Sequence, residues 1–478
     1  MPAKGLSKPA SFRQNSERQS FRLLDTRKPS EDGTSPPSTP SSPDDTFFNL
    51  GDPPNGRKKR KIPKLERSLR FSREAEDQLK AVPQFCFPDA KDWAPVSQFA
   101  SETFSFVLTG EDGSRRFGYC RRLLPSGKGK RLPEVYCIIS RLGCFGLFSK
   151  ILDEVEKRRG VSPALVQPLM RSIMEAPFPA LGKTVVVKSF LPGAGTEVIE
   201  LCRPPDSRLD HVDFRCLFSS LSVRLLVRVF AALLLERRVI FTADNLGTLS
   251  RCCHAMLALV YPFTWQHTYI PLLPPAMLDV VCSPTPFLVG LPTAALPRFE
   301  ELPVEEVLVV DLVHNRFLRQ MDDEDSILPR KLQAALEHVL EQRDTLAGDL
   351  EEGSLDGGLG SLDELVSEAF VRFFVEAVGH YALFLAPGGG QDERTLQRDA
   401  FLKASSSRSL RRFLEVFTET QMFGAFLRER ELRAPAAPGL FELRSQEYLD
   451  SLPSGGEQGG VNKFLKGLGH RMKFLHKK

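Results

Sequence analysis

The sequence has few of the patterns that mark a catalytic or metal-binding site. It contains no H-E-x-x-H, no G-x-S-x-G and no C-x-x-C pair, so a zinc protease, an α/β hydrolase and a thioredoxin-like protein lack support. Gly182, Lys183 and Thr184 imitate the end of a phosphate-binding loop, but Pro177 stands where the first glycine belongs. We therefore predict no catalytic residue, no metal and no cofactor.

The chain also lacks the marks of secretion or membrane insertion. Its first residues contain no apolar signal-peptide core, and its longest apolar run, residues 221–241, is interrupted by charged side chains such as Arg224 and Arg237. The nine cysteines lie in apolar stretches, which is typical of buried free thiols in a reducing compartment. We expect a cytoplasmic protein that is neither secreted nor membrane-spanning.

Charge is divided unevenly along the 478 residues. Residues 1–80 hold 17 Lys and Arg against 11 Asp and Glu, and residues 461–478 hold six basic residues and no acidic ones, whereas the rest is acidic. Two basic ends favour attachment to an anionic membrane surface; for residues 57–61 (RKKRK) a nuclear signal and a solvated tether are the alternatives. Nucleic acid ranks last, because no aromatic residues interleave with the bases to stack on nucleobases.

Residues 1–71 are predicted to form a disordered tail, because they are rich in Ser, Pro and Arg and have no apolar periodicity. Three Ser/Thr-Pro steps and one serine that follows an arginine by three residues could be phosphorylated, which would add dianions to a basic tail. The alternative is that these matches are never modified. A P-x-x-P motif could also recruit adaptor proteins. The phosphorylation candidates are Ser16, Ser35, Thr39 and Ser42.

The sequence pattern of residues 72–204 predicts a first lobe built on one antiparallel sheet with helices on one side. Asp112 and Gly113 form a tight-turn signal between two extended stretches, and residues 147–159 place apolar side chains on one helical face. The predicted strands are residues 102–109, 117–123, 134–142, 185–190 and 197–202.

Residues 211–324 predict a second, α/β lobe. Helical periodicity fills residues 221–235 and 246–260, between extended apolar stretches. The predicted strands are residues 238–241, 268–273, the FLVG segment that ends at Gly290, and 307–312. Such alternation predicts a doubly wound parallel sheet covered on both faces, with its working surface at the carboxyl ends of the strands. Asp311 lies at such an end, where it could meet a partner or serve only a turn.

The sequence pattern of residues 325–441 predicts a helical portion appended to the second lobe. Ser361 with Glu364 forms a capping box, and an apolar stripe at helical spacing follows as far as Tyr381. Residues 442–460 predict a linker, since they end in a Gly-rich stretch.

Residues 461–478 (VNKFLKGLGHRMKFLHKK) are predicted to form a basic amphipathic helix. Its apolar side chains share one face and its basic side chains cover much of the remainder, which is typical of an anchor at a membrane interface. A helix docked on the acidic body of the protein is the alternative. The membrane-binding candidates are Lys463, Phe464, Lys466, Leu468, Arg471, Lys473 and Lys477.

Several of these stretches, taken in order, resemble the DENN-domain family, and most closely its second subfamily. The resemblance extends over roughly residues 79–441, and an ordered series of blocks is more specific than one short motif. The blocks are FCFPD at residues 85–89, ETFSFVL at 102–108, VYCIISRLGCFGLFSKILDEVE at 135–156, ERRVIF at 236–241, YPFTWQHTYIPLLP at 261–274 and SPTPFLVG at 283–290.

The resemblance implies a longin-like first lobe and guanine-nucleotide exchange on a Rab GTPase of endosomal or recycling traffic, without covalent chemistry. A Rab in its GDP-bound and nucleotide-free forms would be met across the cleft between the two lobes. Trp265 could equally be a core anchor, and Arg237 a structural ion-pair partner. A Rab-binding scaffold without exchange activity is the alternative function. The Rab-contact candidates are Arg237, Arg238, Trp265, His267 and Asp311.

Overall fold

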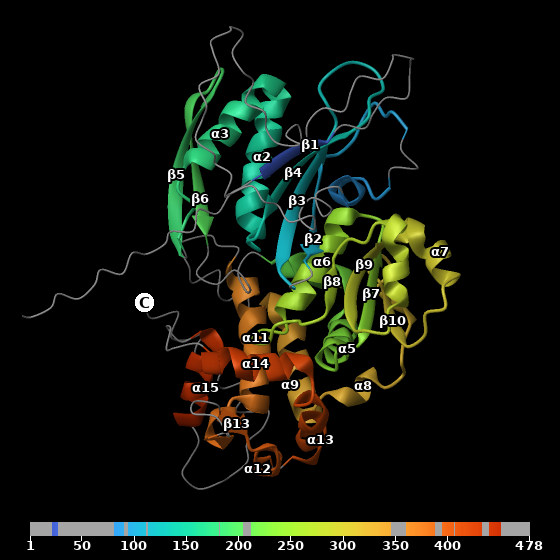
Figure 1. The fold of residues 1–478 in the computed structure, drawn as a ribbon, viewed down its shortest axis with the longest axis vertical. Coiled ribbons are helices and arrows are strands. Elements are labelled where there is room, and N and C mark those ends of the chain that lie inside the picture. Colours follow the sequence, from blue (N-terminus) through green and yellow to red (C-terminus); the bar gives the residue numbers. More distant parts are fainter. Residues whose placement is uncertain are drawn as a thin grey trace, which may run out of the picture.

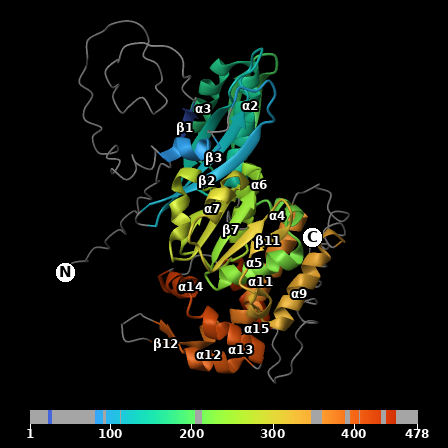
Figure 2. The same ribbon diagram turned by 90° about the vertical axis from the view of Figure 1, so that its right-hand side faces the viewer.

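Three tiers stack along the long axis of the molecule, with a β-rich lobe above an α/β lobe and helices below (Figure 1, Figure 2). The computed structural model describes residues 22–26, 81–89, 94–110, 113–180, 182–203, 212–345, 360–387, 394–405, 407–432 and 439–450. The predicted combination of an antiparallel lobe, an α/β lobe and a helical portion is therefore present.

A four-stranded antiparallel sheet of order β1-β4-β3-β2 organises the first lobe. The hairpin between β2 and β3 turns at Gly113, whose φ of +77° is easily adopted by glycine alone. The strand bounds are Arg22–Thr26 for β1, Glu102–Thr109 for β2, Arg115–Leu123 for β3 and Glu134–Ser140 for β4. Strand β1 falls inside the tail that the sequence predicts to be disordered.

Two helices separate this sheet from a second, two-stranded sheet, which corrects the expectation of a single sheet. Helices α2 (Phe145–Val161) and α3 (Val166–Glu175), joined by a 3-10 turn at Pro163–Leu165, pack between the four-stranded sheet and the hairpin of β5 (Lys183–Leu191) and β6 (Gly195–Arg203) (Figure 1). Buried and exposed residues alternate along β5 and β6, so only one face of this hairpin is covered. The strands were predicted, but their pattern does not say which sheet each joins.

The second lobe contains a five-stranded sheet of order β11-β10-β7-β9-β8. Four strands are parallel, as predicted, but β11 runs antiparallel at one edge, so the sheet is mixed. The turn that follows Asp311 is too short for a crossover helix, and a strand after such a turn can only return antiparallel. The bounds are Arg238–Ala243 for β7, Thr268–Ile270 for β8, Phe287–Pro292 for β9, Val307–Asp311 for β10 and Arg316–Arg319 for β11.

Side chains alternate between the two covered faces of this sheet. In β7, Val239 and Phe241 pack in the core that holds α5 and α6, while Ile240 packs with Phe299 on the other face. Helices α4 (Phe214–Ser220), α5 (Val223–Leu234) and α6 (Leu246–Ala258) cover the first face; the 3-10 turns Pro275–Cys282 and Thr293–Ala295 and helix α7 (Leu296–Glu300) cover the second.

The third tier is helical and packs on the second lobe through aromatic rings. Phe263 from the second lobe lies 5.0, 4.9 and 4.7 Å, between ring centroids, from Phe374, Phe417 and Phe426. The elements are α8 (Glu324–Ile327), α9 (Arg330–Glu341), α11 (Gly360–Val378), a 3-10 turn (Tyr381–Phe384), β12 (Leu385–Pro387), β13 (Arg394–Leu396), α12 (Arg398–Ala404), α13 (Arg408–Phe417), α14 (Gln421–Leu432) and α15 (Leu440–Asp450).

Helix α15 extends into the stretch that was predicted to be a linker. Arg444 binds Glu368 of α11, with a shortest distance of 2.7 Å between Nη2 and Oε1, and Phe441 is fully buried. These contacts hold the helix as far as Asp450.

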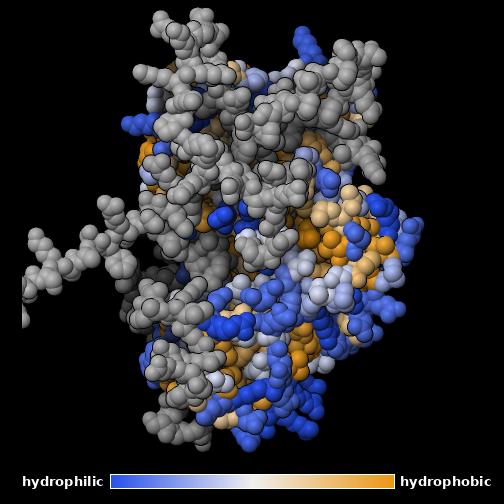
Figure 3. Space-filling model, viewed as in Figure 1, coloured by the Kyte–Doolittle hydropathy of each residue, from blue (hydrophilic) through white to orange (hydrophobic). Residues whose placement is uncertain are grey.

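One hydrophobic core continues through all three tiers. Phe106 of the first lobe, Phe241 of the second and Phe373 of the third belong to the same buried cluster. On the face shown in Figure 3, hydrophilic side chains cover most of the helical tier and hydrophobic patches lie between them.

Within the described part of the chain, no single helix has the length and apolar character to cross a membrane. The pair α4 and α5, bent by 111° relative to each other, meets that test on length and composition alone.

Candidate functional site

A cleft of about 1070 Å³ opens between the first and second lobes. All three tiers contribute to its walls: Val107 and Arg115 from the first lobe, residues 264–268 from the second and Gln421 from the start of α14. Apolar side chains such as Phe85 lie among these polar groups. A large concave surface with this mixture is the expected character of a binding site.

The segment from Phe263 to Tyr269 forms one wall, and it alternates between anchors and cleft-facing residues. Phe263, Trp265 and Tyr269 are only 3%, 2% and 1% exposed. Gln266, which lies between two of these anchors, is exposed and lines the cleft. Strand β8 begins only at Thr268, so the residues before it are held by the packing of these aromatic side chains. The three buried aromatic residues therefore fix the backbone, while Gln266 remains available to a partner.

Arg115 of β3 holds the same segment from the first lobe. Its Nη2 donates hydrogen bonds to the carbonyl oxygens of Trp265 and His267, at 2.9 and 3.3 Å. Its guanidinium carbon lies 5.5 Å from the ring centroid of Tyr269. Burial lowers the pKa of Arg115, but a guanidinium starts so far above neutrality that it stays charged. A permanent cation thus fixes the backbone of this wall.

Glu236 connects this wall to the third tier. Its Oε2 lies 3.1 Å from Nε2 of His267, and its carboxylate accepts hydrogen bonds from the backbone N–H of Gln421 and Met422 at 3.0 and 2.7 Å. Burial pushes the pKa of Glu236 upward, but the close contact with His267 and the hydrogen bonds from the two N–H groups outweigh it and hold the pKa below its ordinary value. A carboxylate at a helix N-terminus is also stabilised by the helix dipole. One side chain therefore positions both His267 and the start of α14.

A buried polar chain joins the first two lobes where β2 meets α6. Oγ of Ser105 lies 2.7 Å from Nε2 of His254, and the hydroxyl of Tyr269 contacts the other ring nitrogen. Burial lowers the pKa of His254 to about 3, so its ring is neutral near pH 7, with one nitrogen donating and the other accepting. The two lobes share hydrogen bonds as well as a core.

Glu102 of the first lobe caps the N-terminus of α6. Its Oε1 accepts hydrogen bonds from the N–H of Leu246 at 2.9 Å and of Gly247 at 3.4 Å, and its Oε2 lies 2.8 Å from Nη2 of Arg122. Gly247 allows this approach, because a Cβ atom there would lie 2.6 Å from the carbonyl oxygen of Thr103. The contacts hold the lobes in one relative orientation, and so they set the shape of the cleft.

Two of the five predicted contact residues, Trp265 and His267, line the cleft. Arg238 stands at the amino end of β7 and donates to the carbonyl oxygen of Glu305, whereas Asp311 stands at the opposite end of the neighbouring strand β10. The five residues therefore do not share one surface.

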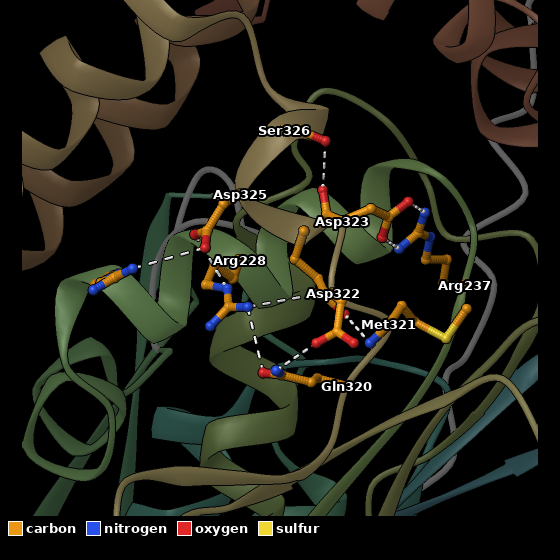
Figure 4. Close-up of polar contacts among 10 residues, drawn as sticks. Arg228, Arg237, Gln320, Met321, Asp322, Asp323, Asp325 and Ser326 are labelled. Atoms are coloured by element: carbon orange, nitrogen blue, oxygen red, sulfur yellow. Dashed lines mark hydrogen bonds and ion pairs between the residues drawn. The ribbon is translucent and has the colours of Figure 1, made fainter.

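Asp311 and Arg237 each have structural partners. The carboxylate of Asp311 accepts hydrogen bonds from the N–H of Val313 at 3.1 Å and from Nε of Arg316 at 3.2 Å, within its own turn. Arg237 donates two hydrogen bonds, of 2.5 and 2.6 Å, to the carboxylate of Asp323 (Figure 4). Whether either residue also meets a partner remains a prediction.

Several exposed cleft residues were missed from the sequence, among them Gln266 and Gln421. Gln266 stands between Trp265 and His267, and the alternation of aromatic and polar residues from Phe263 to Gln266 is a sequence signal that could have identified it. Gln421 is exposed at the first position of α14, more than 150 residues downstream. Nothing in the local sequence around Gln421 indicates that it reaches the cleft.

Three cysteines form the one described group whose ligand atoms are close enough to hold a metal. The Sγ atoms of Cys86, Cys120 and Cys137 all lie within 4.8 Å of one another, and all three residues are buried. Burial raises the pKa of the Cys120 thiol well above its ordinary value, which keeps it protonated, and a protonated thiol is a poor ligand. The group fits small apolar core residues, and the absence of a metal remains a prediction.

The remaining predicted sites lie outside the described residues. They are the phosphorylation candidates Ser16, Ser35, Thr39 and Ser42 and the membrane-binding candidates Lys463, Phe464, Lys466, Leu468, Arg471, Lys473 and Lys477.

Three family models match successive parts of the chain. The uDENN domain matches residues 63–123, the DENN (AEX-3) domain residues 131–315 and the dDENN domain residues 397–444. The cleft lies where the three meet: Arg115 falls in the first match, Gln266 in the second and Gln421 in the third.

Curated relatives agree with these matches. The chain is 63% identical to DENN domain-containing protein 2A of Homo sapiens, with 99% of this chain and 59% of the relative aligned. It is 66% identical to DENN domain-containing protein 2B of Homo sapiens over 87% of this chain and 36% of the relative. DENN domain-containing protein 2D of Mus musculus is 48% identical, with 81% of each chain aligned. The chain thus spans less than two thirds of the first two relatives and most of the third.

Proposed function

The chain belongs to the DENN-domain family, in its second subfamily, and from that membership we propose that it is a guanine-nucleotide exchange factor for a Rab GTPase. Exchange needs no covalent step, which agrees with a sequence that has no catalytic motif. The function proposed is the release of GDP from a Rab that is bound through its switch regions in the cleft between the lobes.

The alternation along residues 263–269 is the observation that best supports the cleft as the contact surface. Gln266 is exposed between anchors that are buried in the second and third tiers. A surface held this rigidly loses little conformational entropy on binding, so more of the contact energy is available to distort the partner. We assign Gln266, Gln421 and Thr109 as contact residues, with Trp265 and His267 as their supports.

Differential binding would drive the release of nucleotide. A factor that binds the nucleotide-free GTPase more tightly than the loaded form lowers nucleotide affinity by the same ratio. A ratio of ~10⁴ corresponds to about 5.5 kcal/mol, which a few well-packed anchors can supply. Rigid walls favour this mechanism, because the partner rather than the cleft must change shape.

The two basic ends would place this activity at a membrane. Residues 57–61 carry five contiguous basic residues, and residues 461–478 combine a basic and an apolar face. Each basic side chain near an anionic leaflet contributes about 1 kcal/mol. We propose a cytoplasmic protein that is peripherally attached to endosomal, vesicle or plasma membranes, where lipid-anchored GTPases are concentrated.

Fluorescent GDP release from a panel of purified Rabs tests the proposed function. The full chain should accelerate release from one or two Rabs and bind their nucleotide-free forms more tightly than their GDP-loaded forms. The rival scaffold would bind both forms equally and accelerate release from none. That result with a folded protein would refute exchange while leaving Rab binding intact.

A further inference from the structure

A second concave surface lies where the second lobe meets the helical tier. Its volume is about 490 Å³, it lies between the α8–α9 segment and α13, and it shares no lining residue with the interlobe cleft. We call it the basic groove. Its lining includes Leu235, Ile327, Arg330, Arg408, Arg412 and Val416.

Three arginines give the groove its charge. Arg330 is the first residue of α9, Arg408 and Arg412 lie one turn apart on α13, and all three are exposed. None of the three has an ion-pair partner among the residues that the structure describes. The acidic lining residue Asp325 is already engaged by Nε of Arg228 at 3.2 Å (Figure 4). The groove is therefore a cationic site without an internal counterion.

Apolar side chains also line the groove beside the guanidinium groups. Val416 is 52% exposed, and the lining residues at 409, 413 and 416 follow the helical spacing that places them on one side of α13. Leu235 and Ile327 stand opposite, from the second lobe and from α8. A ligand that carries both negative charge and a bulky apolar group would match this lining best. An acidic peptide with aromatic side chains has this chemistry, whereas an inositol phosphate headgroup has no apolar part.

Two helix N-termini are fixed side by side at the groove. The backbone N–H of Arg330 donates a 3.1 Å hydrogen bond to Oγ of Ser409, which joins the first turns of α9 and α13. Partial positive charge at both helix ends adds to that of the three guanidinium groups. The hydrogen bond also keeps Arg330 and Arg408 in fixed relative positions, so the groove is formed before a ligand arrives.

The chain itself contains a segment with the required chemistry. Residues 42–50 (SPDDTFFNL) combine Asp44 and Asp45 with Phe47 and Phe48. We propose that this acidic, aromatic segment binds in the basic groove, with its carboxylates on the arginines and a phenylalanine against Val416. Phosphorylation of Ser42 would add about two negative charges beside the aspartates and strengthen the contact.

The connecting chain is long enough for this contact within one molecule. Roughly 30 residues separate residue 50 from Ala81, which lines the interlobe cleft, and they could span up to about 100 Å. The two concave surfaces are neighbours, because Leu235 of the groove precedes Glu236, whose carboxylate binds the start of α14 at the cleft. The segment would thus dock beside the proposed Rab site, and the proposal does not depend on exchange activity.

A labelled peptide measures this interaction directly. The probe is a fluorescein-labelled synthetic peptide of residues 42–50, and its anisotropy is followed with four full-length proteins. They are the wild type, the tail variant Phe47→Ser/Phe48→Ser, the tail variant with Arg408→Glu/Arg412→Glu, and the tail variant with Arg215→Glu/Lys403→Glu. The last pair is the matched control, since Arg215 and Lys403 are exposed, lie outside the groove and give the same change in charge.

The tail variant should bind the peptide in a salt-dependent manner. The wild type should bind it at least fivefold more weakly, because its own segment competes at a high effective concentration. Arg408→Glu/Arg412→Glu should weaken binding at least tenfold, the control pair should leave it unchanged, and the Ser42-phosphorylated peptide should bind several-fold more tightly. Thermal melts establish that each variant is folded.

Three results would overturn the proposal. The tail variant could fail to bind the peptide, the groove substitutions could have no greater effect than the control pair, or the wild type and tail variant could bind the peptide equally. Binding of inositol hexakisphosphate that depends on Arg408 and Arg412, with no binding of the peptide, would instead assign the groove to phosphorylated headgroups.

Discussion

Oγ of Ser105 and Nε2 of His254 lie 2.7 Å apart across the interface of the first two lobes, although 149 residues separate them in the chain. Because Tyr269 contacts the second ring nitrogen, the buried imidazole is hydrogen-bonded on both sides. The lobes that form the cleft are therefore joined through a group that acid would force to ionise.

Stability should fall below about pH 6.5 because of this histidine. Burial lowers the pKa of His254 to about 3, whereas an unfolded chain restores it to about 6.5, so the unfolded state binds the extra proton. The part of the free energy of unfolding that depends on neutral His254 is essentially complete above about pH 6.5. It decreases as the pH falls, and the loss reaches about 2 kcal/mol at pH 5. Urea unfolding at pH 7 and pH 5 measures it.

His254→Gln should reduce this pH dependence, because glutamine does not titrate. His380, whose pKa burial lowers to about 4, contributes in the same direction in both proteins, so the difference between them isolates His254. An unchanged difference between pH 7 and pH 5 in the variant would contradict the assignment.

Gly247→Ala should destabilise the lobe interface. An added Cβ would stand 2.6 Å from the carbonyl oxygen of Thr103, so α6 would have to move away from β2, at a cost of about 1–3 kcal/mol. Gly160→Ala is the matched control, since it lies in α2 with no atom within 4 Å of the added Cβ and should stabilise by up to about 1 kcal/mol. Equal effects of the two substitutions on the free energy of unfolding in urea would show that the close contact between Gly247 and Thr103 does not exclude a larger side chain at position 247.

Removing the carboxylate of Glu236 should loosen the start of α14 and free His267. Glu236→Ala removes the acceptor for two helix N–H groups, which should cost about 1–3 kcal/mol. Hydrogen exchange should speed up in the first turn of α14. Glu301→Ala, at an exposed glutamate outside the cleft, should leave both readouts unchanged. Unaltered exchange at Gln421 and Met422 in Glu236→Ala would argue against the capping role.

Thiol labelling should separate the cysteines into two classes. Cys202 and Cys282 are exposed, and hydrogen bonding to Cys252 together with the charge of Arg251 lowers the pKa of Cys216 to about 7. These three should react with iodoacetamide at pH 7 long before Cys86, Cys120 and Cys137, which are buried. Mass spectrometry of the native full chain reads the order, and early labelling of the buried group would show that the first-lobe core opens readily.

Local pattern was enough to predict much of the fold. The strand predicted at residues 102–109 matches β2, and the helix predicted at residues 246–260 matches α6 within two residues, because each has a clear period of two or 3.6. The two-stranded sheet of β5 and β6 was not foreseen, since pairing depends on contacts between distant segments. Strand β11 is short and half-exposed, with little apolar pattern to mark it.

The candidate site was predicted less well than the fold. The blocks shared with the DENN family led to Trp265 and His267, which do line the cleft. The position of Asp311 at a predicted strand end made it a candidate too, but its carboxylate is used within its own turn. A charged residue at a strand end looks the same in sequence whether it binds a partner or a turn. Only the tertiary arrangement of β3, residues 264–268 and α14 identifies Gln266 and Gln421 as neighbours in one cleft.

Fluorescent GDP release with a cleft variant tests the central claim most directly. Gln266→Arg/Gln421→Arg places two charges in the cleft, and Gln167→Arg/Gln446→Arg is the matched control at exposed glutamines of α3 and α15. On a Rab that the wild type activates, we predict at least a tenfold loss of acceleration for the cleft variant and none for the control. Equal acceleration by the wild type and the cleft variant would contradict the account.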